Sequence, residues 1–198
     1  MSNLSFSYTH NQFTKTIQLY GDRAGGQGNF EFAGLVELQS QKILLVHGIS
    51  QSLEEIHDWR RLSRLIHLAK KLQLPIALWN LPLLQSSIKL HKTSLALSTV
   101  IGNVQTEILR FPHPIIAIFD ESNDTDIIVK ELDLADGFAV VSFDKQTPTE
   151  ISVIKKDHLK ILNKQEDLQM EILNLLNELS KISTEELIKY RIDRFNIS

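Results

Sequence analysis

Four short runs of apolar residues, each four or five residues long, recur along the middle of the chain: Ile43–Val46, Ile76–Trp79, Ile115–Phe119 and Phe138–Val141. None of them alternates apolar with polar residues, as a strand with one solvated face does. A strand that is buried on both faces needs apolar residues at every position, and such strands belong to parallel sheets covered by helices. The runs therefore predict an α/β fold with a parallel core sheet.

Helical patterns separate these strands and close the chain. Apolar residues recur every three or four positions from Leu53 to Leu72, and Ser52 with Glu55 predicts a capping box at the start. A second helix is expected over residues 93–110. Two more are expected at 165–182 and 184–195, the last beginning at the capping sequence Ser183-Thr184-Glu185-Glu186.

The parts before and between these elements are predicted less directly. Residues 11–20 predict a short helix, because Phe13, Ile17 and Tyr20 fall at i, i+4 and i+7. Residues 30–39 and 42–47 predict an antiparallel strand pair joined by a turn at Ser40-Gln41. A helix over 124–134 and a short strand over 150–154 complete the expected elements.

Length and composition bound the class of protein. A chain of 198 residues can form one sizeable domain, which we divide into a core at 1–145 and a helical extension at 146–198 that packs on the core or on a partner. The absence of cysteine excludes disulfides and thiolate metal sites and favours a reducing cytoplasm. The net charge of −3 gives no argument for nucleic acid or membrane binding. Neither a membrane span nor a signal peptide is expected.

Few residues suggest a catalytic or binding site. The glycines of residues 21–28 precede a strand rather than a helix, so they indicate a turn, with a ligand loop as the alternative. The seven histidines are dispersed, and no metal site is expected. His47 ends a buried strand just before Gly48, where it is either a structural or a site histidine.

Acidic residues follow the third apolar run. Asp120, Glu121, Asp124 and Asp126 lie where α/β folds place their sites, at the carboxyl end of a parallel strand. An exposed acidic loop and a divalent cation site both explain them. No phosphate-binding loop and no nucleophile elbow occur in the sequence.

Several separated segments, taken in order, match one family. They are Leu19-Tyr20-Gly21-Asp22-Arg23, Phe32-Ala33-Gly34-Leu35 through Val46-His47-Gly48, Arg60-Arg61-Leu62 through Pro75-Ile76, Phe111-Pro112-His113-Pro114, Leu134-Ala135-Asp136, and Leu179 through Tyr190-Arg191 and Arg194-Phe195. In this order they resemble the alpha subunit of the bacterial carboxyltransferase of acetyl-CoA carboxylase, a member of the crotonase (ClpP-like) superfamily. The resemblance implies a crotonase-like ββα spiral with a parallel core sheet and a helical C-terminal extension.

The chain departs from this family where catalysis would take place. Crotonase-type enzymes hold a thioester enolate with backbone N–H groups of a glycine-rich loop. The matching loop here contains no glycine and is made of Glu121, Ser122, Asn123, Asp124, Thr125 and Asp126. Each carboxylate within ~4 Å of the enolate would oppose it by up to ~4 kcal/mol at an effective dielectric near 20.

Two further losses agree with the first. The family's glycine-containing loop after the second core strand is replaced by the shorter, glycine-free Asn80-Leu81-Pro82-Leu83-Leu84-Gln85-Ser86, and the segments that shape the acyl pocket after Ser142 are missing. The resemblance therefore implies a catalytically degenerate oxyanion loop, with no catalytic residue expected. His47, Gly48 and Asn80 are the weak candidates for substrate binding.

Two functions compete, and a third is disfavoured. The first is a degenerate homologue that acts as a binding or regulatory subunit in fatty-acid biosynthesis, with a beta-type carboxyltransferase subunit or itself as partner. The second is an active, divergent alpha subunit or related acyl-CoA enzyme. An acyl-CoA would then bind, and biotin would be supplied in trans on a carrier domain. A ClpP-like protease is disfavoured because no serine stands at a strand–helix elbow. No cofactor is expected to be bound by the chain itself.

Overall fold

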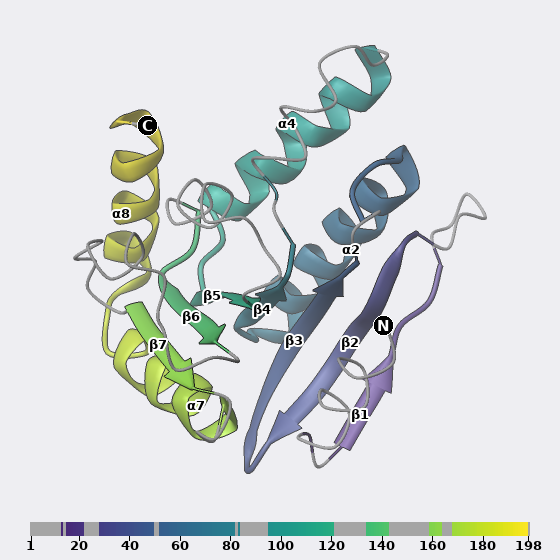
Figure 1. Ribbon diagram of the computed structural model, residues 1–198. Coiled ribbons are helices and arrows are strands. Elements are labelled where there is room, and N and C mark those ends of the chain that lie inside the picture. Colours follow the sequence, from purple (N-terminus) through teal and green to yellow (C-terminus); the bar gives the residue numbers. More distant parts are fainter. Residues whose placement is uncertain are drawn as a thin grey trace.

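The computed structural model describes residues 13, 15–21, 28–49, 52–81, 83, 95–120, 134–142, 159–163 and 168–197 (Figure 1). The strands are β1 (Lys15–Gln18), β2 (Phe30–Leu38), β3 (Gln41–Gly48), β4 (Ile76–Trp79), β5 (Ile115–Asp120), β6 (Gly137–Ser142) and β7 (Leu159–Asn163). The helices are α2 (Ile56–Leu72), α4 (Leu95–Leu109), α7 (Leu168–Leu179) and α8 (Thr184–Ile197).

All seven of these strands form one sheet in chain order, from β1 at one edge to β7 at the other. The first three strands are antiparallel, whereas β3 to β7 run parallel. The four apolar runs are the inner parallel strands β3 to β6, so the predicted mixed architecture with a parallel core is confirmed. Each of these runs has a hydrogen-bonded neighbour on both sides.

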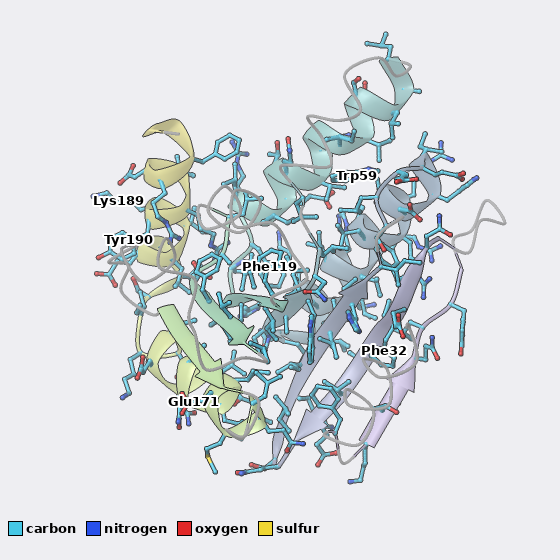
Figure 2. All side chains as sticks on the ribbon, in the orientation of Figure 1. Phe32, Trp59, Phe119, Glu171, Lys189 and Tyr190 are labelled. Atoms are coloured by element: carbon cyan, nitrogen blue, oxygen red, sulfur yellow. The ribbon has the colours of Figure 1, made fainter. Side chains whose placement is uncertain are left out.

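Helices cover both faces of the sheet. Figure 1 shows α2 and α4 side by side over one face and α7 over the other, with α8 beyond the β6–β7 side. Successive residues of β4 point to opposite faces: Leu78 belongs to the core cluster that contains Trp59 of α2, and Ala77 belongs to the one that contains Ile172 of α7. Figure 2 labels Trp59 and Phe119, both in the core beneath α2 and α4. Burial of both faces is what the continuous apolar runs predict.

The N-terminal helix prediction is wrong for the part that the structure describes, because residues 15–18 form β1. This strand pairs antiparallel with β2, and Ile17 lies opposite Leu35. The helical spacing was misleading: Phe13 is buried, but Ile17 and Tyr20 are exposed. The lack of a side chain at Gly34 lets β1 approach β2 closely enough to pair, since a Cβ at this position would overlap the Ile17 carbonyl oxygen.

The long helix begins three residues later than predicted, at Ile56. Leu53 has a φ of 67°, which is left-handed and cannot belong to a right-handed helix. The helix start is satisfied by Asp58, whose carboxylate accepts the Glu55 N–H at 3.2 Å. Ser52 serves the preceding turn instead, where its hydroxyl accepts the Ile49 N–H at 2.8 Å. The hairpin turn also shifts by one residue, to Gln39–Ser40.

The last part of the chain contains a strand that the sequence reasoning missed. β7 pairs parallel with β6, so residues 159–163 extend the same sheet. Both C-terminal helices are confirmed. At the start of α8 the Ser183 hydroxyl accepts the Glu186 N–H at 3.3 Å, and the Glu186 carboxylate accepts the Ser183 N–H at 3.2 Å, as in a capping box. The division into 1–145 and 146–198 stays a prediction.

Three predicted features lie outside the described residues: the acidic loop at 121–126, the helix over 124–134 except Leu134, which lies in a turn, and the strand over 150–154. The glycine-rich segment is described only at Gly21 and Gly28. Among the described residues, none of the helices is long and apolar enough to cross a membrane.

Candidate functional site

The three weak site candidates lie together at the carboxyl ends of β3 and β4. His47 and Trp79 are register partners on these parallel strands. Their side chains lie on the face that α7 covers, with ring centroids 5.1 Å apart and planes inclined by 30°. Both residues are buried, so this pair of rings forms part of the packed core at the strand ends.

Gly48 and Asn80 meet one residue further along the two strands. A Cβ at Gly48 would lie 2.5 Å from the Asn80 carbonyl oxygen and 2.8 Å from Leu81 Cδ1. The backbone of Asn80 is left-handed, with a φ of 47°, and its N–H donates to the Ile118 carbonyl at 2.8 Å. The glycine therefore allows β3 to approach the chain after β4 closely, and this chain occupies the space that the missing side chain leaves.

The residues after β4 continue into the core. Leu81 and Leu83 are both buried and belong to the cluster beneath α2 and α4. The resemblance implies only that a glycine-containing loop is missing here. The structure adds that Leu81 and Leu83 are packed as core residues, and each contributes about 1.5 to 3 kcal/mol of hydrophobic stabilisation.

Trp79 is the residue at this end that the sequence reasoning missed. Within the part of the chain that the structure describes, no acceptor lies within hydrogen-bonding distance of its indole N–H, although the residue is only 5% exposed. An unsatisfied buried donor costs about 1 to 3 kcal/mol. The sequence does contain a signal for this donor, because Trp79 ends a strand that is buried on both faces. The backbone carbonyls near such a residue already accept hydrogen bonds within the sheet, so few acceptors are left for the indole N–H.

A second polar cluster lies at the opposite, amino end of the parallel strands. Arg191 of α8 is fully buried, and its Nε donates to the Asp136 carboxylate at 2.8 Å. Its other nitrogens donate to the Ile108 carbonyl at 2.8 Å and the His113 carbonyl at 3.2 Å. The second Asp136 oxygen accepts the Ile115 N–H at 2.8 Å. Burial raises the pKa of Asp136, while the charge of Arg191 and these hydrogen bonds oppose the rise.

This cluster joins three of the segments that carry the family resemblance. Asp136 follows Leu134-Ala135, His113 belongs to Phe111-Pro112-His113-Pro114, and Arg191 follows Tyr190 in the C-terminal tail. Thr184, at the start of α8, adds a further hydrogen bond to this end of the sheet, because its hydroxyl donates to the Pro112 carbonyl at 3.0 Å. The matching segments at this end are therefore held together by one structural network, remote from the strand ends where chemistry is expected.

A third cluster surrounds the start of α2. Asp58 is buried and also accepts the Asn29 N–H at 2.6 Å. Arg61 is buried too, donates to the Leu19 carbonyl, and lies 5.3 Å from the centroid of the Phe30 ring. The sequence analysis did not identify Arg61 as a buried residue of this helix. The signal that was missed is the i, i+3 spacing of Asp58 and Arg61 on the face that turns toward β2.

Metal ligation finds no support in the described part of the chain, where His, Asp and Glu side chains form no group of three able to hold an ion. The degenerate oxyanion loop, Glu121 to Asp126, lies outside this part. Its expected role therefore stays a prediction.

Comparison with solved structures identifies the architecture. The chain matches transcarboxylase 12S, in a structure described as a hexamer with methylmalonyl-coenzyme A and methylmalonic acid bound, with a TM-score of 0.56 and 10% identity. The fold is similar to that of carboxyltransferase subunits. The match covers 89% of this chain but only 42% of the transcarboxylase chain, so the chain spans less than half of the protein that it resembles.

A second carboxyltransferase structure matches more weakly. The beta subunit of geranyl-CoA carboxylase from P. aeruginosa has a TM-score of 0.48 and 15% identity over 82% of this chain and 35% of its own. No protein-family model matches the sequence, and no curated protein matches it. At these identities the likeness concerns the fold alone, an acyl-CoA carboxyltransferase-like fold.

Proposed function

We propose that the chain is a catalytically degenerate relative of the carboxyltransferase alpha subunit of acetyl-CoA carboxylase, and that it acts as a binding or regulatory subunit linked to fatty-acid biosynthesis. We also keep the crotonase-like ββα spiral as the finer description of its fold. The observation that carries the proposal is the packing after β4. Leu81 and Leu83 occupy the core where a catalytic relative would present a glycine-containing loop.

The cost of opening this site supports the proposal. A thioester that approached the β3 and β4 ends would meet the Asn80 carbonyl and Leu81 at the position beside Gly48. Exposing Leu81 and Leu83 together would cost about 3 to 6 kcal/mol of hydrophobic stabilisation. A binding site that first requires this opening loses roughly two to four powers of ten in affinity.

The first experiment measures chemistry. Enolate formation, the step that an oxyanion hole assists, exchanges the methyl protons of acetyl-CoA with deuterium from solvent, and mass spectrometry detects this exchange. The proposal expects no exchange above that of buffer, no decarboxylation of malonyl-CoA, and no heat on calorimetric titration with either thioester at millimolar concentration. Exchange that requires the native fold would overturn the degenerate assignment.

The second experiment concerns the partner. Transcarboxylase 12S assembles as a hexamer, which supports self-association or a subunit partner for a chain of similar fold. Sedimentation of the chain alone, and with a beta-type carboxyltransferase subunit, separates these two cases. A monomer at high concentration that does not bind the beta-type subunit would refute the binding role.

One observation favours the alternative, an active divergent alpha subunit. Asn80 is a left-handed non-glycine residue at the carboxyl end of a parallel strand, and backbone strain of about 1 to 3 kcal/mol is concentrated at functional sites. Under this alternative the chain would transfer a carboxyl group to an acyl-CoA from biotin carried in trans. The exchange experiment separates the alternatives, and exchange that appears only when the beta-type subunit is added would favour the active assignment.

A further inference from the structure

The exposed face of α2 concentrates positive charge in a chain whose net charge is −3. This 17-residue helix contains five lysines and arginines but a single acidic residue, the buried Asp58. Exposed cations lie along one side of it, at Arg60, Arg64, Lys70 and Lys71. If α2 is set apart, the remainder of the chain is strongly acidic, so the basic face is a local feature.

Helix electrostatics explain only half of this face. Lys70 and Lys71 lie in the last turn, where cations interact favourably with the unpaired carbonyls of the helix end. Arg60 and Arg64 lie in the first half, nearer the positive end of the dipole. Neither forms an ion pair with a carboxylate among the described residues, whose ion pairs involve other cations. Neither the helix dipole nor ion pairing among the described residues therefore accounts for the placement of Arg60 and Arg64.

An exposed tyrosine belongs to a segment that α2 holds through Arg61 and Arg64. Tyr20 is 72% exposed, and its hydroxyl donates to Gln18 Oε1 at 2.6 Å. The Arg64 guanidinium donates to the carbonyl of the next residue, Gly21, and Arg61 donates to the carbonyl of the preceding one, Leu19. These two bonds attach the Tyr20 segment to α2 at Arg61 and Arg64. Arg60 lies one helical turn before Arg64 and is exposed like it, so it extends the same side of the helix.

The positive charge at this surface is crowded. The pKa of the Arg61 guanidinium is lowered first by burial and next by the charge of Arg64, while Asp58 and Tyr20 oppose the lowering. Arg64 therefore lies close enough to Arg61 for the two cations to repel one another. A negatively charged group bound at Arg60 and Arg64 would relieve this repulsion.

We propose that Tyr20, Arg60 and Arg64 form a docking surface for an acidic protein segment. Arginine and tyrosine are enriched where protein interfaces gain most of their binding energy, and a guanidinium pairs with a carboxylate through two parallel hydrogen bonds. A nucleic acid fits this surface less well, because a duplex engages about six to ten cations and the chain as a whole is negative. The inference rests on the proposed binding role, for which it names the chemistry of the partner.

The test uses a fluorescein-labelled polyglutamate peptide and measures its anisotropy as the full chain is added. The double variant Arg60→Glu/Arg64→Glu is compared with Lys70→Glu/Lys71→Glu, which changes the charge of the same helix equally. The first pair should weaken binding at least ~10-fold and the second less than ~3-fold. Tyr20→Ala, which leaves the charge unchanged, should weaken binding about 3-fold or more, since tyrosine is among the residues that contribute most to binding at protein interfaces. Thermal unfolding of every variant confirms that it folds.

Several outcomes would overturn the inference. Equal weakening by the two charge-reversed pairs would show diffuse attraction rather than a site. The absence of peptide binding by the wild type at about 50 mM salt, where charges are least screened, would remove the site altogether. Tighter binding of CoA, duplex DNA or anionic vesicles through the same arginines would assign the surface to phosphate. None of these results changes the deuterium-exchange experiment, so failure of this inference and failure of the proposed function are distinguishable.

Discussion

Replacement of Arg191 by methionine tests the network at the amino end of the sheet. Methionine retains much of the length and apolar volume of arginine, so the packing around the α8 side chain is largely kept. The variant loses the guanidinium, its 2.8 Å bond to Asp136 and its bonds to the Ile108 and His113 carbonyls. It leaves a carboxylate whose side chain is only 2% exposed without its main counter-charge.

The expected loss is large. Removal of one partner from a buried ion pair costs about 3 to 5 kcal/mol, since the remaining charge stays desolvated. For a chain of this length that corresponds to a fall in Tm of roughly 6 to 20 °C. Arg194→Met is the matched control, because Arg194 lies 3.9 Å from the same Asp136 oxygen but is partly exposed. Its loss should cost no more than about 1 kcal/mol.

The stability lost in Arg191→Met depends on pH because Asp136 can bind a proton. Burial raises the pKa of this carboxyl, and Arg191 opposes the rise. Without Arg191 the folded-state pKa increases further above the unfolded value, and the folded variant gains stability from binding a proton at low pH. That contribution is present below the unfolded pKa and is lost as pH rises through the folded one. The deficit of Arg191→Met relative to wild type should therefore be smaller at about pH 5 than at about pH 7.

Urea unfolding followed by tryptophan fluorescence measures these quantities, because Trp59 and Trp79 are both buried in the folded protein. The double variant Arg191→Met/Asp136→Asn, which removes both charges, should be more stable than the sum of the two single losses predicts, by about 1 to 3 kcal/mol. A loss below about 1 kcal/mol for Arg191→Met, or a deficit that grows on acidification, would refute the reasoning.

Four further changes test other parts of the structure. Gly34→Ala should displace β1 and cost about 1 to 3 kcal/mol, seen as lost hydrogen-exchange protection in residues 15–18. Gly102→Ala, at an open site in the middle of α4, should instead raise stability by about 0.5 to 1 kcal/mol. Trp79→Phe should cost less than the ~3 kcal/mol of a large core truncation, because it also removes an unsatisfied donor; a greater loss in urea unfolding would show that the indole N–H has a partner. Ser183→Ala should cost about 0.5 to 2 kcal/mol in the same measurement, and no change would show that the α8 cap does not stabilise the helix.

The inner strands were predictable because burial on both faces requires an uninterrupted run of apolar residues, which is visible in the local sequence. Every residue from Ile76 to Trp79 is buried, and the predicted bounds of β4 coincide with the observed ones. The same reasoning predicts a strand at Phe138–Val141, which lies within β6 at Gly137–Ser142. In these segments the requirement for apolar side chains leaves little room for another interpretation.

The edge strands were not predictable in this way. β1 and β7 each have a single neighbour in the sheet, so half of their environment is set by β2 or β6 rather than by their own residues. In β1 the residues Lys15–Gln18 form a strand because Gly34, far along the sequence, lets their backbone approach β2. In β7 the apolar run is interrupted by Lys160. Local patterns contain no information about such pairing.

The site candidates show the same limit. The positions of His47, Gly48 and Asn80 next to one another follow from two neighbouring parallel strands, which the sequence predicts. The Asn80 backbone occupies the space beside Gly48, and this depends on the path of the chain after β4. That path is set by where Leu81 and Leu83 can be buried, and this is a property of the whole core. Whether a glycine leaves space for a ligand was therefore not predictable from its place in the sequence.

The two ends of the sheet explain why a resemblance in sequence informs the fold more than the chemistry. At the amino end Asp136 and Arg191 hold α8 against β5 and β6, and losing either one costs about 3 to 5 kcal/mol. Since a folded domain has only about 5 to 15 kcal/mol of stability, the fold of this chain depends on this network. At the carboxyl end Leu81 and Leu83 stabilise the core by burying the segment after β4. Under the proposed function, residues of the first kind maintain a fold like that of transcarboxylase 12S, while residues of the second kind close the position at which a glycine-containing loop would serve catalysis.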